Sequence, residues 1–593
     1  MDVENKIHSV RTLVPLPVID QVIEESQLDQ RKPTQLSDSF PSFNNSLLVV
    51  PKVIKVIKNT IGIGSKRVLL IECGAPATSI YGSPRAIGIE ILDDLASKEG
   101  FKTIMFNTQN DSLQDILQEV KEGDIVALSS LSPGFKTAFV LGKAIKEKFQ
   151  DKVLVIKGGL HETFVGERYQ TTISNYPIDI SFLGDVDICF GDFLRIVKNA
   201  TFRSNLELFD ELNNLSPIAF KGKAGIVKKG NVKGNDFVFP ELRHLELSKP
   251  FTIFRSQTSN DLMIRVMSTR GCPECCTFCN VGARDTVKVN SNKLIDYIGN
   301  VIDEHEVLET GKHIRYVFFE DGTFITEKKN EGRILYQSKY SSDEWFSILS
   351  DETKKLNDRL VESYGFNLSF AFQTTIPSIL NGVPTLKKLK EVGLESVYIG
   401  VETLFDDKRK SVSKSGTGED CIKAIEILHS LGINTSCSTM VDLGSEECAT
   451  YTIEELMKRG VLEVFNEYRA VYPGTPDSRR VLKWVNKLGE GYFGELFTQE
   501  EIEDLYSRGR IHSGSVNFED KSKLVAKLFN EAVVIISKGE ELFSDEHSRK
   551  ALLVLVDNDI LCKKSSEYYE GLRRIATSYG YEVLNNGHYR KIV

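Results

Sequence analysis

Short apolar runs that alternate with helical stretches constrain the fold of this 593-residue chain more than any other feature. The pattern begins with "KRVLLIEC" (66–73), which is followed by the helix-like segment 83–100. Four more apolar runs follow: "FKTIMFN" (101–107), "DIVALSS" (124–130), "KVLVIKGG" (152–159) and "ISFLGD" (180–185). Strands that alternate with helices predict a parallel sheet covered on both faces. We therefore expect a doubly wound, Rossmann-like α/β domain over residues 65–200, with its ligand at the carboxyl ends of the strands.

A second series of the same kind follows. Its six apolar runs are "LMIRVMST" (262–269), "IRYVFFED" (314–321), "NLSFAFQTT" (367–375), "SVYIGVET" (396–403), "NTSCSTMVDL" (434–443) and "VLEVFNEYRAVYPG" (461–474). Six strand–helix units are too few for an eight-stranded barrel, so we expect a partial (β/α)6 barrel over residues 259–482. The remaining parts are expected to be an irregular N-terminal extension (1–64), a linker (201–258) and a helical C-terminal region (483–593).

Charge and hydropathy limit the partners of the protein. A net charge of −9 argues against a protein that binds nucleic acids in general. No apolar run approaches the length of about 18 residues that indicates a membrane-spanning helix. The start, "MDVENKIHSV", lacks the apolar core of a signal peptide. We therefore expect a cytoplasmic protein without membrane attachment, in which thiols stay reduced and clustered cysteines bind metal.

Four of the ten cysteines crowd into "GCPECCTFCN" (271–280). A structural zinc site usually needs two separated cysteine pairs, and a bacterial ferredoxin needs C-x2-C-x2-C; neither pattern occurs. The spacing Cys272-x3-Cys276-x2-Cys279 remains, directly after the first apolar run of the second series, at a strand end where barrels place chemistry. Three thiolates can bind three irons of a [4Fe–4S] cluster and leave the fourth iron open.

With the aromatic Phe278, this spacing resembles the signature of the radical S-adenosylmethionine (radical SAM) superfamily, C-x3-C-x-aromatic-C. The resemblance implies that Cys272, Cys276 and Cys279 bind a [4Fe–4S] cluster whose open iron chelates SAM. One-electron reduction then cleaves SAM to a 5′-deoxyadenosyl radical, which implies an electron donor such as flavodoxin or ferredoxin. Two interpretations of Cys275 stay open: a loop residue that takes no part in the cluster, or an alternate ligand or reactive thiol.

Two further segments resemble the family. In "FFEDGTF" (318–324), the resemblance implies that Glu320 and Asp321 lie near the methionyl ammonium of SAM. In "YIGVET" (398–403), it implies that Glu402 accepts hydrogen bonds from the ribose hydroxyls.

The domain in front resembles that of the cobalamin-binding branch of the superfamily, especially in "GGLHETF" (158–164). The resemblance implies that Ser129, Gly158, Gly159 and His161 lie against cobalamin. The loop after the first strand, "ECGAPATS", offers no histidine for cobalt. Two readings stay open, a domain that binds cobalamin and a vestigial domain without cofactor.

The resemblance points first to a cobalamin-dependent methyltransferase that acts on an unactivated carbon of a small molecule or peptide. One alternative is a radical SAM rearrangement, cyclisation or bond-forming enzyme without methyl transfer. The other is a non-enzymatic iron–sulfur electron carrier. We assign no catalytic residue from the sequence.

Overall fold

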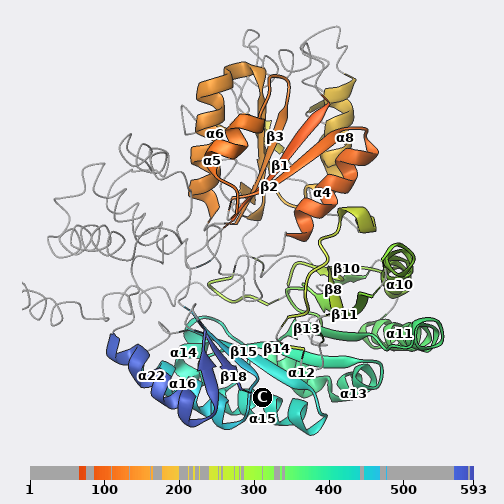
Figure 1. Cartoon of the computed structure of the whole chain (residues 1–593). Coiled ribbons are helices and arrows are strands. Elements are labelled where there is room, and N and C mark those ends of the chain that lie inside the picture. The colour runs from red at the N-terminus through yellow and green to blue at the C-terminus, as the bar shows by residue number, and fades with distance from the viewer. Residues whose placement is uncertain are drawn as a thin grey trace, which may run out of the picture. The chain divides into compact units, whose positions relative to one another are not determined.

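The computed structural model describes residues 66–476 and 566–592, apart from loops of which the longest are 75–85, 164–176, 200–210, 228–238, 326–333 and 468–475. The expected N-terminal extension (1–64) and most of the expected C-terminal region (483–593) lie outside the described residues. Two sheets organise the rest (Figure 1). No helix among the described residues has both the length and the apolar character needed to cross a bilayer.

The first sheet has the strand order β2-β1-β3-β4-β5-β6-β7. Its strands are β1 (Arg67–Cys73), β2 (Lys102–Asn107), β3 (Ile125–Ser130), β4 (Leu154–Gly158), β5 (Ile180–Phe182), β6 (Ile218–Phe220) and β7 (Ile226–Val227). The first five run parallel, whereas β6 and β7 extend the sheet in antiparallel fashion. The expected α/β class is confirmed. The two antiparallel strands come from the segment that we expected to be a linker, so part of it belongs to this sheet.

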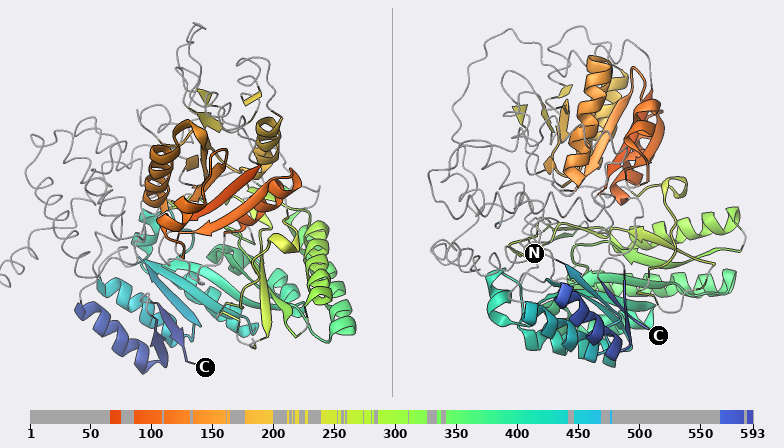
Figure 2. Two further views of the ribbon diagram at one scale, coloured as in Figure 1. Left: turned by 45° about the horizontal axis from the view of Figure 1, so that its top comes forward. Right: turned by 60° about the vertical axis from the view of Figure 1, so that its left-hand side comes forward.

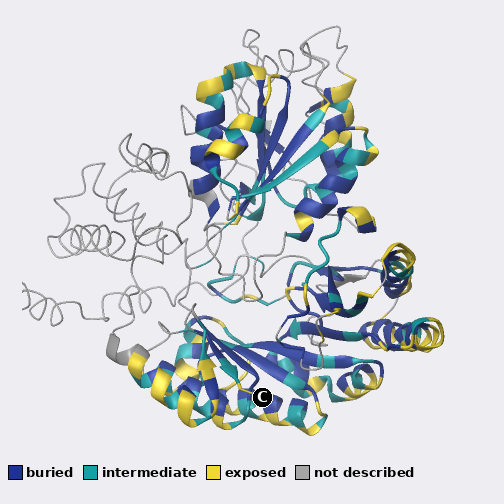
Figure 3. Cartoon of the chain, viewed as in Figure 1, coloured by how far each residue is buried: buried dark blue, intermediate teal, exposed yellow. Residues whose placement is uncertain are grey.

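Helices cover both faces of this sheet (Figure 1). On one face lie α4 (Ile87–Lys98) and α8 (Asp187–Lys198), which share an apolar core with Val68 and Leu70 of β1. On the other lie α5 (Leu113–Glu119) and α6 (Phe135–Phe149), packed with Leu69 and Ile71. Alternate residues of one strand thus serve two cores, which explains why the strand reads as a continuous apolar run. Figure 3 shows buried strands between helices with exposed outer sides.

The second sheet has the order β17-β18-β16-β15-β14-β13-β11-β8. Its six parallel strands follow chain order: β8 (Asp261–Val266), β11 (His313–Phe319), β13 (Ser369–Thr374), β14 (Leu394–Glu402), β15 (Asn434–Met440) and β16 (Glu463–Glu467). The helices are α10 (Ser291–Leu308), α11 (Ser342–Tyr364), α12 (Ile376–Asn381), α13 (Val383–Glu391), α14 (Asp406–Ser411), α15 (Gly418–Ser430) and α16 (Glu446–Lys458). Figure 2 shows these helices along the outer side of the sheet. Between them and the strands lies the largest core, which includes the fully buried Trp345.

The end of the chain corrects one expectation. The region 483–593 was predicted to be helical, but α22 (Ser566–Ser578) is followed by β17 (Tyr581–Val583) and β18 (Tyr589–Lys591). β18 pairs antiparallel with β16 and covers the edge of the barrel sheet, which would otherwise leave unpaired backbone groups. The Asn-Gly pair in "YEVLNNGHYR" (581–590) is a hairpin signal that the helical interpretation overlooked.

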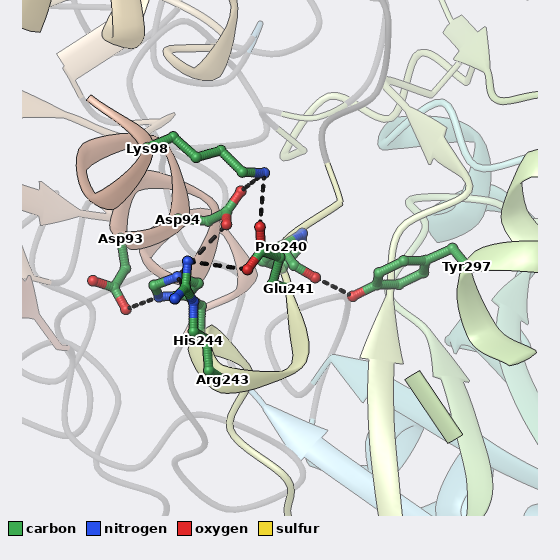
Figure 4. A network of polar contacts seen from close by, with 8 residues as sticks. All are labelled: Asp93, Asp94, Lys98, Pro240, Glu241, Arg243, His244 and Tyr297. Carbon is green, nitrogen blue, oxygen red and sulfur yellow. Dashed lines mark hydrogen bonds and ion pairs between the residues drawn. The ribbon is translucent and has the colours of Figure 1, made fainter. Parts of the chain in front are cut away.

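A short segment connects the helices of the two sheets (Figure 4). It contains the 3-10 turn η3 (Leu242–His244), which the chain reaches just before β8. His244 Nδ1 lies 2.7 Å from Asp93 Oδ2 on α4. Tyr297 Oη, on α10, donates a hydrogen bond of 2.9 Å to Pro240 O. The segment therefore contacts a helix of each part.

Three residues of this network, Asp94, Glu241 and His244, have potential metal-ligand atoms within 4.8 Å of one another. Two cations already lie among them (Figure 4). Lys98 Nζ is 2.6 Å from Asp94 Oδ2, and Arg243 Nη2 is 3.0 Å from Glu241 Oε2. Arg243 Nε also donates to His244 Nε2 at 3.1 Å. We interpret the network as structural, because its carboxylates are neutralised without a metal.

Candidate active site

The clustered cysteines differ in exposure. Cys272 is buried, Cys276 and Cys279 are partly buried, and Cys275 is exposed. Burial raises the pKa of Cys272 to about 12 and that of Cys276 to about 11, so both are thiols at neutral pH until a metal displaces their protons. Among the described residues, these three spaced cysteines do not form a group whose ligand atoms all lie within 4.8 Å.

The cysteine loop is anchored at two points. Before it, β9 (Thr269–Arg270) pairs with β10 (Thr286–Lys288), which pairs in turn with β12 (Ile334–Tyr336). Within it, the Thr277 amide donates a hydrogen bond of 3.0 Å to the Val412 carbonyl. These contacts hold the loop at the carboxyl end of β8.

Asp321 ties the end of β11 to the end of β8. Its Oδ1 accepts hydrogen bonds from the amides of Ser268 at 2.7 Å and Thr269 at 2.8 Å, and its Oδ2 accepts one from the Ser268 hydroxyl. Complete burial raises the pKa of Asp321 to about 6, although Lys288 and these hydrogen bonds oppose the rise. The carboxylate is thus committed to the backbone just before the cysteine loop.

Glu320, the neighbouring residue, has a different environment. Its Oε1 accepts a hydrogen bond of 2.8 Å from Arg265, and its side chain stays partly exposed. Of the two acids expected near the SAM ammonium, Glu320 is the one with solvent access. That role stays a prediction for both.

Glu402 ends β14 close to the cysteine loop. It is 5% exposed, and its carboxylate accepts hydrogen bonds from Lys414 Nζ at 2.7 Å and Ser438 Oγ at 3.2 Å. Lys414 Nζ also lies 5.9 Å from the centre of the Phe278 ring. Burial lowers the pKa of Lys414, but the charge and hydrogen bond of Glu402 outweigh burial and raise it. The structure thus brings together two sequence-predicted positions, Phe278 and Glu402, through a lysine.

Sequence reasoning missed Lys414. The backbone shows how tightly the pair is built: Glu402 adopts a φ of 63°, a left-handed conformation that is uncommon outside glycine. A Cβ at Gly400 would lie 2.4 Å from Glu402 Oε1 and 2.5 Å from Lys414 Nζ, so a larger residue there would displace the ends of both side chains. The available signal was a lysine in the loop "SVSKSGTGED" (411–420) after an acid-ended strand.

A cavity lies at the carboxyl ends of the first sheet. Its lining includes Ser129 at the end of β3 and Gly158 and Gly159 at the end of β4. Gly159 has a φ of 99°, and a Cβ there would lie 2.3 Å from the Ser130 carbonyl oxygen, so only glycine keeps the two loops this close. His161, the fourth residue expected here, lies outside the described residues. The apolar side chains of β3, β4 and α4 in the lining suit a large, flat cofactor.

Another part of the cavity lining comes from the segment that leads into the cysteine loop. Arg265, Met267 and Arg270 line it. Arg270 also donates a hydrogen bond to the carboxylate of Asp187, the first residue of α8. Burial raises the pKa of Asp187, and Arg270 partly offsets this effect. Arg270 precedes Cys272 by two positions, so the lining segment leads along the chain into the cysteine loop.

Comparison with known proteins agrees with this arrangement. The radical SAM superfamily model matches residues 266–449, which include the cysteine loop and Glu402. An uncharacterised methyltransferase of Pyrococcus horikoshii is 22% identical over 72% of this chain and 81% of its own length. The anaerobic magnesium-protoporphyrin IX monomethyl ester cyclase of Rubrivivax gelatinosus is 25% identical over 59% of this chain and 56% of its own.

Among solved structures, the cobalamin-dependent SAM radical enzyme OxsB, with aqua-cobalamin and SAM bound, covers 88% of this chain and 84% of its own. The TM-score is 0.52 at 13% identity, so the likeness concerns the fold. The cysteine spacing, the strand order and the family match agree: residues 266–449 form a radical SAM domain, and this chain is a radical SAM enzyme.

Proposed function

We propose that this enzyme methylates an unactivated carbon, using SAM both as the radical precursor and as the source of the methyl group. The observation that carries the proposal is the shared segment of β8 and β9. Arg265, Met267 and Arg270 line the glycine-bordered cavity, and the same segment runs directly into Cys272. A corrinoid in the cavity would therefore lie beside the SAM site.

The residues fit the two absent groups. Three buried or partly buried cysteines offer thiolates to three irons, and the cavity offers apolar walls with glycines at its edge. When bound, a [4Fe–4S] cluster would supply the electron that cleaves SAM, and a corrinoid would supply the methyl group.

The chain's own residues would hold and orient SAM. Glu402 would accept the ribose hydroxyls, because its carboxylate is fixed by Lys414 and by the hydroxyl of Ser438. Glu320 is exposed enough to contact the ammonium group of SAM. Asp321 would hold the start of the cysteine loop through its hydrogen bond with the Ser268 amide. Ser129, Gly158, Gly159 and His161 would border the corrinoid.

The relatives support both this function and one alternative. The Pyrococcus horikoshii relative is named a methyltransferase, which favours methyl transfer. The Rubrivivax gelatinosus relative is named a cyclase, which favours radical ring formation without methyl transfer. The organic substrate, a small molecule or peptide, and an electron donor such as flavodoxin or ferredoxin complete the proposal.

A matched pair of glycine substitutions tests the corrinoid site. Gly88 lines the cavity from α4, and a Cβ there meets no atom within 4 Å, so Gly88→Leu would fill the cavity without disturbing the protein. Gly571 on α22 is equally open and serves as the control, Gly571→Leu. Anaerobically purified protein is incubated with hydroxocobalamin and passed through gel filtration.

We expect wild type and Gly571→Leu to retain corrinoid and Gly88→Leu to retain little, with equal iron content in all three. Retention of corrinoid by Gly88→Leu at the wild-type level would place it elsewhere. A wild type that retains none would overturn the proposal.

A further inference from the structure

A buried ion pair lies directly beneath the loop that borders the cavity. Lys157, in β4, and Glu162, in the loop after it, are 1% and 0% exposed. Lys157 Nζ donates to Glu162 Oε2 at 2.5 Å. The hydroxyl of Ser181, in β5, donates to the other carboxylate oxygen, Oε1. One carboxylate therefore links the loop to two adjacent strands.

The next residue strengthens the same attachment. Thr163 Oγ1 donates to the Gly159 carbonyl at 3.0 Å and accepts from the Gly184 amide at 2.9 Å. The Thr163 amide also donates to the Gly159 carbonyl at 3.0 Å. Glu162 and Thr163 together fix the loop to β4, to β5 and to the turn after β5.

This network lies beside the cavity. Lys157, Gly158, Gly159, Leu160 and Thr163 all belong to the lining. A buried ion pair is an expensive way to stabilise a fold, since apolar residues of similar size are often as good or better. The Lys157–Glu162 pair matters here for geometry, because it fixes the positions of Gly158 and Gly159.

We propose that Glu162 is a positioning residue for the corrinoid: with Lys157 and Ser181 it holds Gly158, Gly159 and Thr163 in the conformation that leaves room for the cofactor. The inference rests on the proposed corrinoid site. It assigns Glu162 no contact with the cofactor and no chemical step.

Two variants separate positioning from stability. Glu162→Gln keeps the size of the side chain but removes the charge that Lys157 needs. The double variant Lys157→Met/Glu162→Leu removes both charges, so no buried charge is left uncompensated, and the links to Ser181 are lost as well. The control, Asp179→Asn, breaks the buried pair of Asp179 with Lys146 in the same domain, just before β5 and away from the cavity.

The measurement is hydroxocobalamin binding by the full chain, followed by the change in corrinoid absorbance, with the melting temperature as the readout of stability. We expect both Glu162 variants to bind about 10- to 100-fold more weakly, by analogy with the loss of affinity at metal sites when the residues that orient the ligands are mutated. The double variant should nevertheless melt near wild type. Asp179→Asn should melt lower and bind as wild type does.

Wild-type binding in the double variant would show that the network serves stability alone and would overturn the inference. Unchanged binding in Glu162→Gln would do the same. If wild type itself binds no corrinoid, the proposed function fails first, so the two failures are distinguishable.

Discussion

At the scale of single residues, the candidate site places charges where burial would be costly without partners. Glu402 is almost completely buried, and Lys414 and Ser438 compensate for it. Such a carboxylate has a fixed position, and its hydrogen-bond partners are in place before any ligand arrives. These properties suit a group that recognises the hydroxyls of a nucleoside.

The cysteines give the first prediction. Alanine at Cys272, Cys276 or Cys279 removes one of only three thiolates with ligand spacing, so iron–sulfur absorbance and SAM cleavage should both be lost. Cys275→Ala is the matched control, because this thiol is exposed on the same loop. Absorbance spectra of anaerobically reconstituted protein measure the outcome. A cluster that disappears only in Cys275→Ala would show that the ligands have been misassigned.

Glu402 gives the second prediction. Glu402→Gln keeps the shape but removes the charge, and a hydrogen bond to a charged group contributes about 1.5–3 kcal/mol, so we expect SAM to bind about 10- to 100-fold more weakly. The cluster should remain. Glu419→Gln, which alters an exposed pair with Lys423, is the control and should bind SAM normally. Equal SAM affinity in Glu402→Gln and wild type would move the ribose site elsewhere.

At the scale of secondary-structure elements, Asp321 joins two neighbouring strand ends through three hydrogen bonds. Asp321→Asn can still accept both amide hydrogens at Oδ1, so the variant should fold and keep the loop in place. The wild-type carboxyl group differs from the amide of Asp321→Asn because it can lose a proton. Its folded pKa of about 6 lies above the ordinary value of 3.8, so its stabilising contribution is complete below about pH 4 and is lost as the pH rises through about 6.

The third prediction follows from the raised pKa of Asp321. The free energy of unfolding of wild type, relative to Asp321→Asn, should fall by an amount on the order of 2 kcal/mol between about pH 4 and about pH 7. Urea unfolding of the apoprotein, followed by the fluorescence of the buried Trp345, measures it. A difference that stays constant or grows over this interval would contradict the raised pKa.

The elements that the sequence predicted well are the buried parallel strands. Residues 66–73 and 396–403 were expected as strands, and the structure has β1 over Arg67–Cys73 and β14 over Leu394–Glu402. A strand buried on both faces must be apolar throughout, so local composition reveals it. The short strands β6 and β7 have too few residues to form such a run, and β17 and β18 are indicated only by the Asn-Gly pair between them.

The same reasoning explains what was missed in the site. The cysteine spacing is local, so it could be read directly. The contacts of Glu402 with Lys414 and of Lys157 with Glu162 need a particular turn of the backbone, and neither spacing is a motif by itself. The tie between Asp321 and Ser268 joins residues 53 positions apart and requires the sheet to be in place.

At the scale of the whole molecule, the central claim is that two kinds of chemistry meet at one segment, Arg265–Cys272. The glycine-bordered cavity lies on one side of it and the cysteine loop continues from it. If both cofactors bind there, radical formation and methyl transfer should be separable by filling the cavity alone.

The most direct test is a product analysis that needs no knowledge of the organic substrate. Anaerobic protein reconstituted with iron, sulfide and hydroxocobalamin is incubated with SAM and a strong reductant, and chromatography quantifies 5′-deoxyadenosine and S-adenosylhomocysteine. We predict both products for wild type and for Gly571→Leu, and 5′-deoxyadenosine alone for Gly88→Leu. A wild type that retains corrinoid and forms 5′-deoxyadenosine but no S-adenosylhomocysteine would contradict methyl transfer and leave the cyclisation alternative.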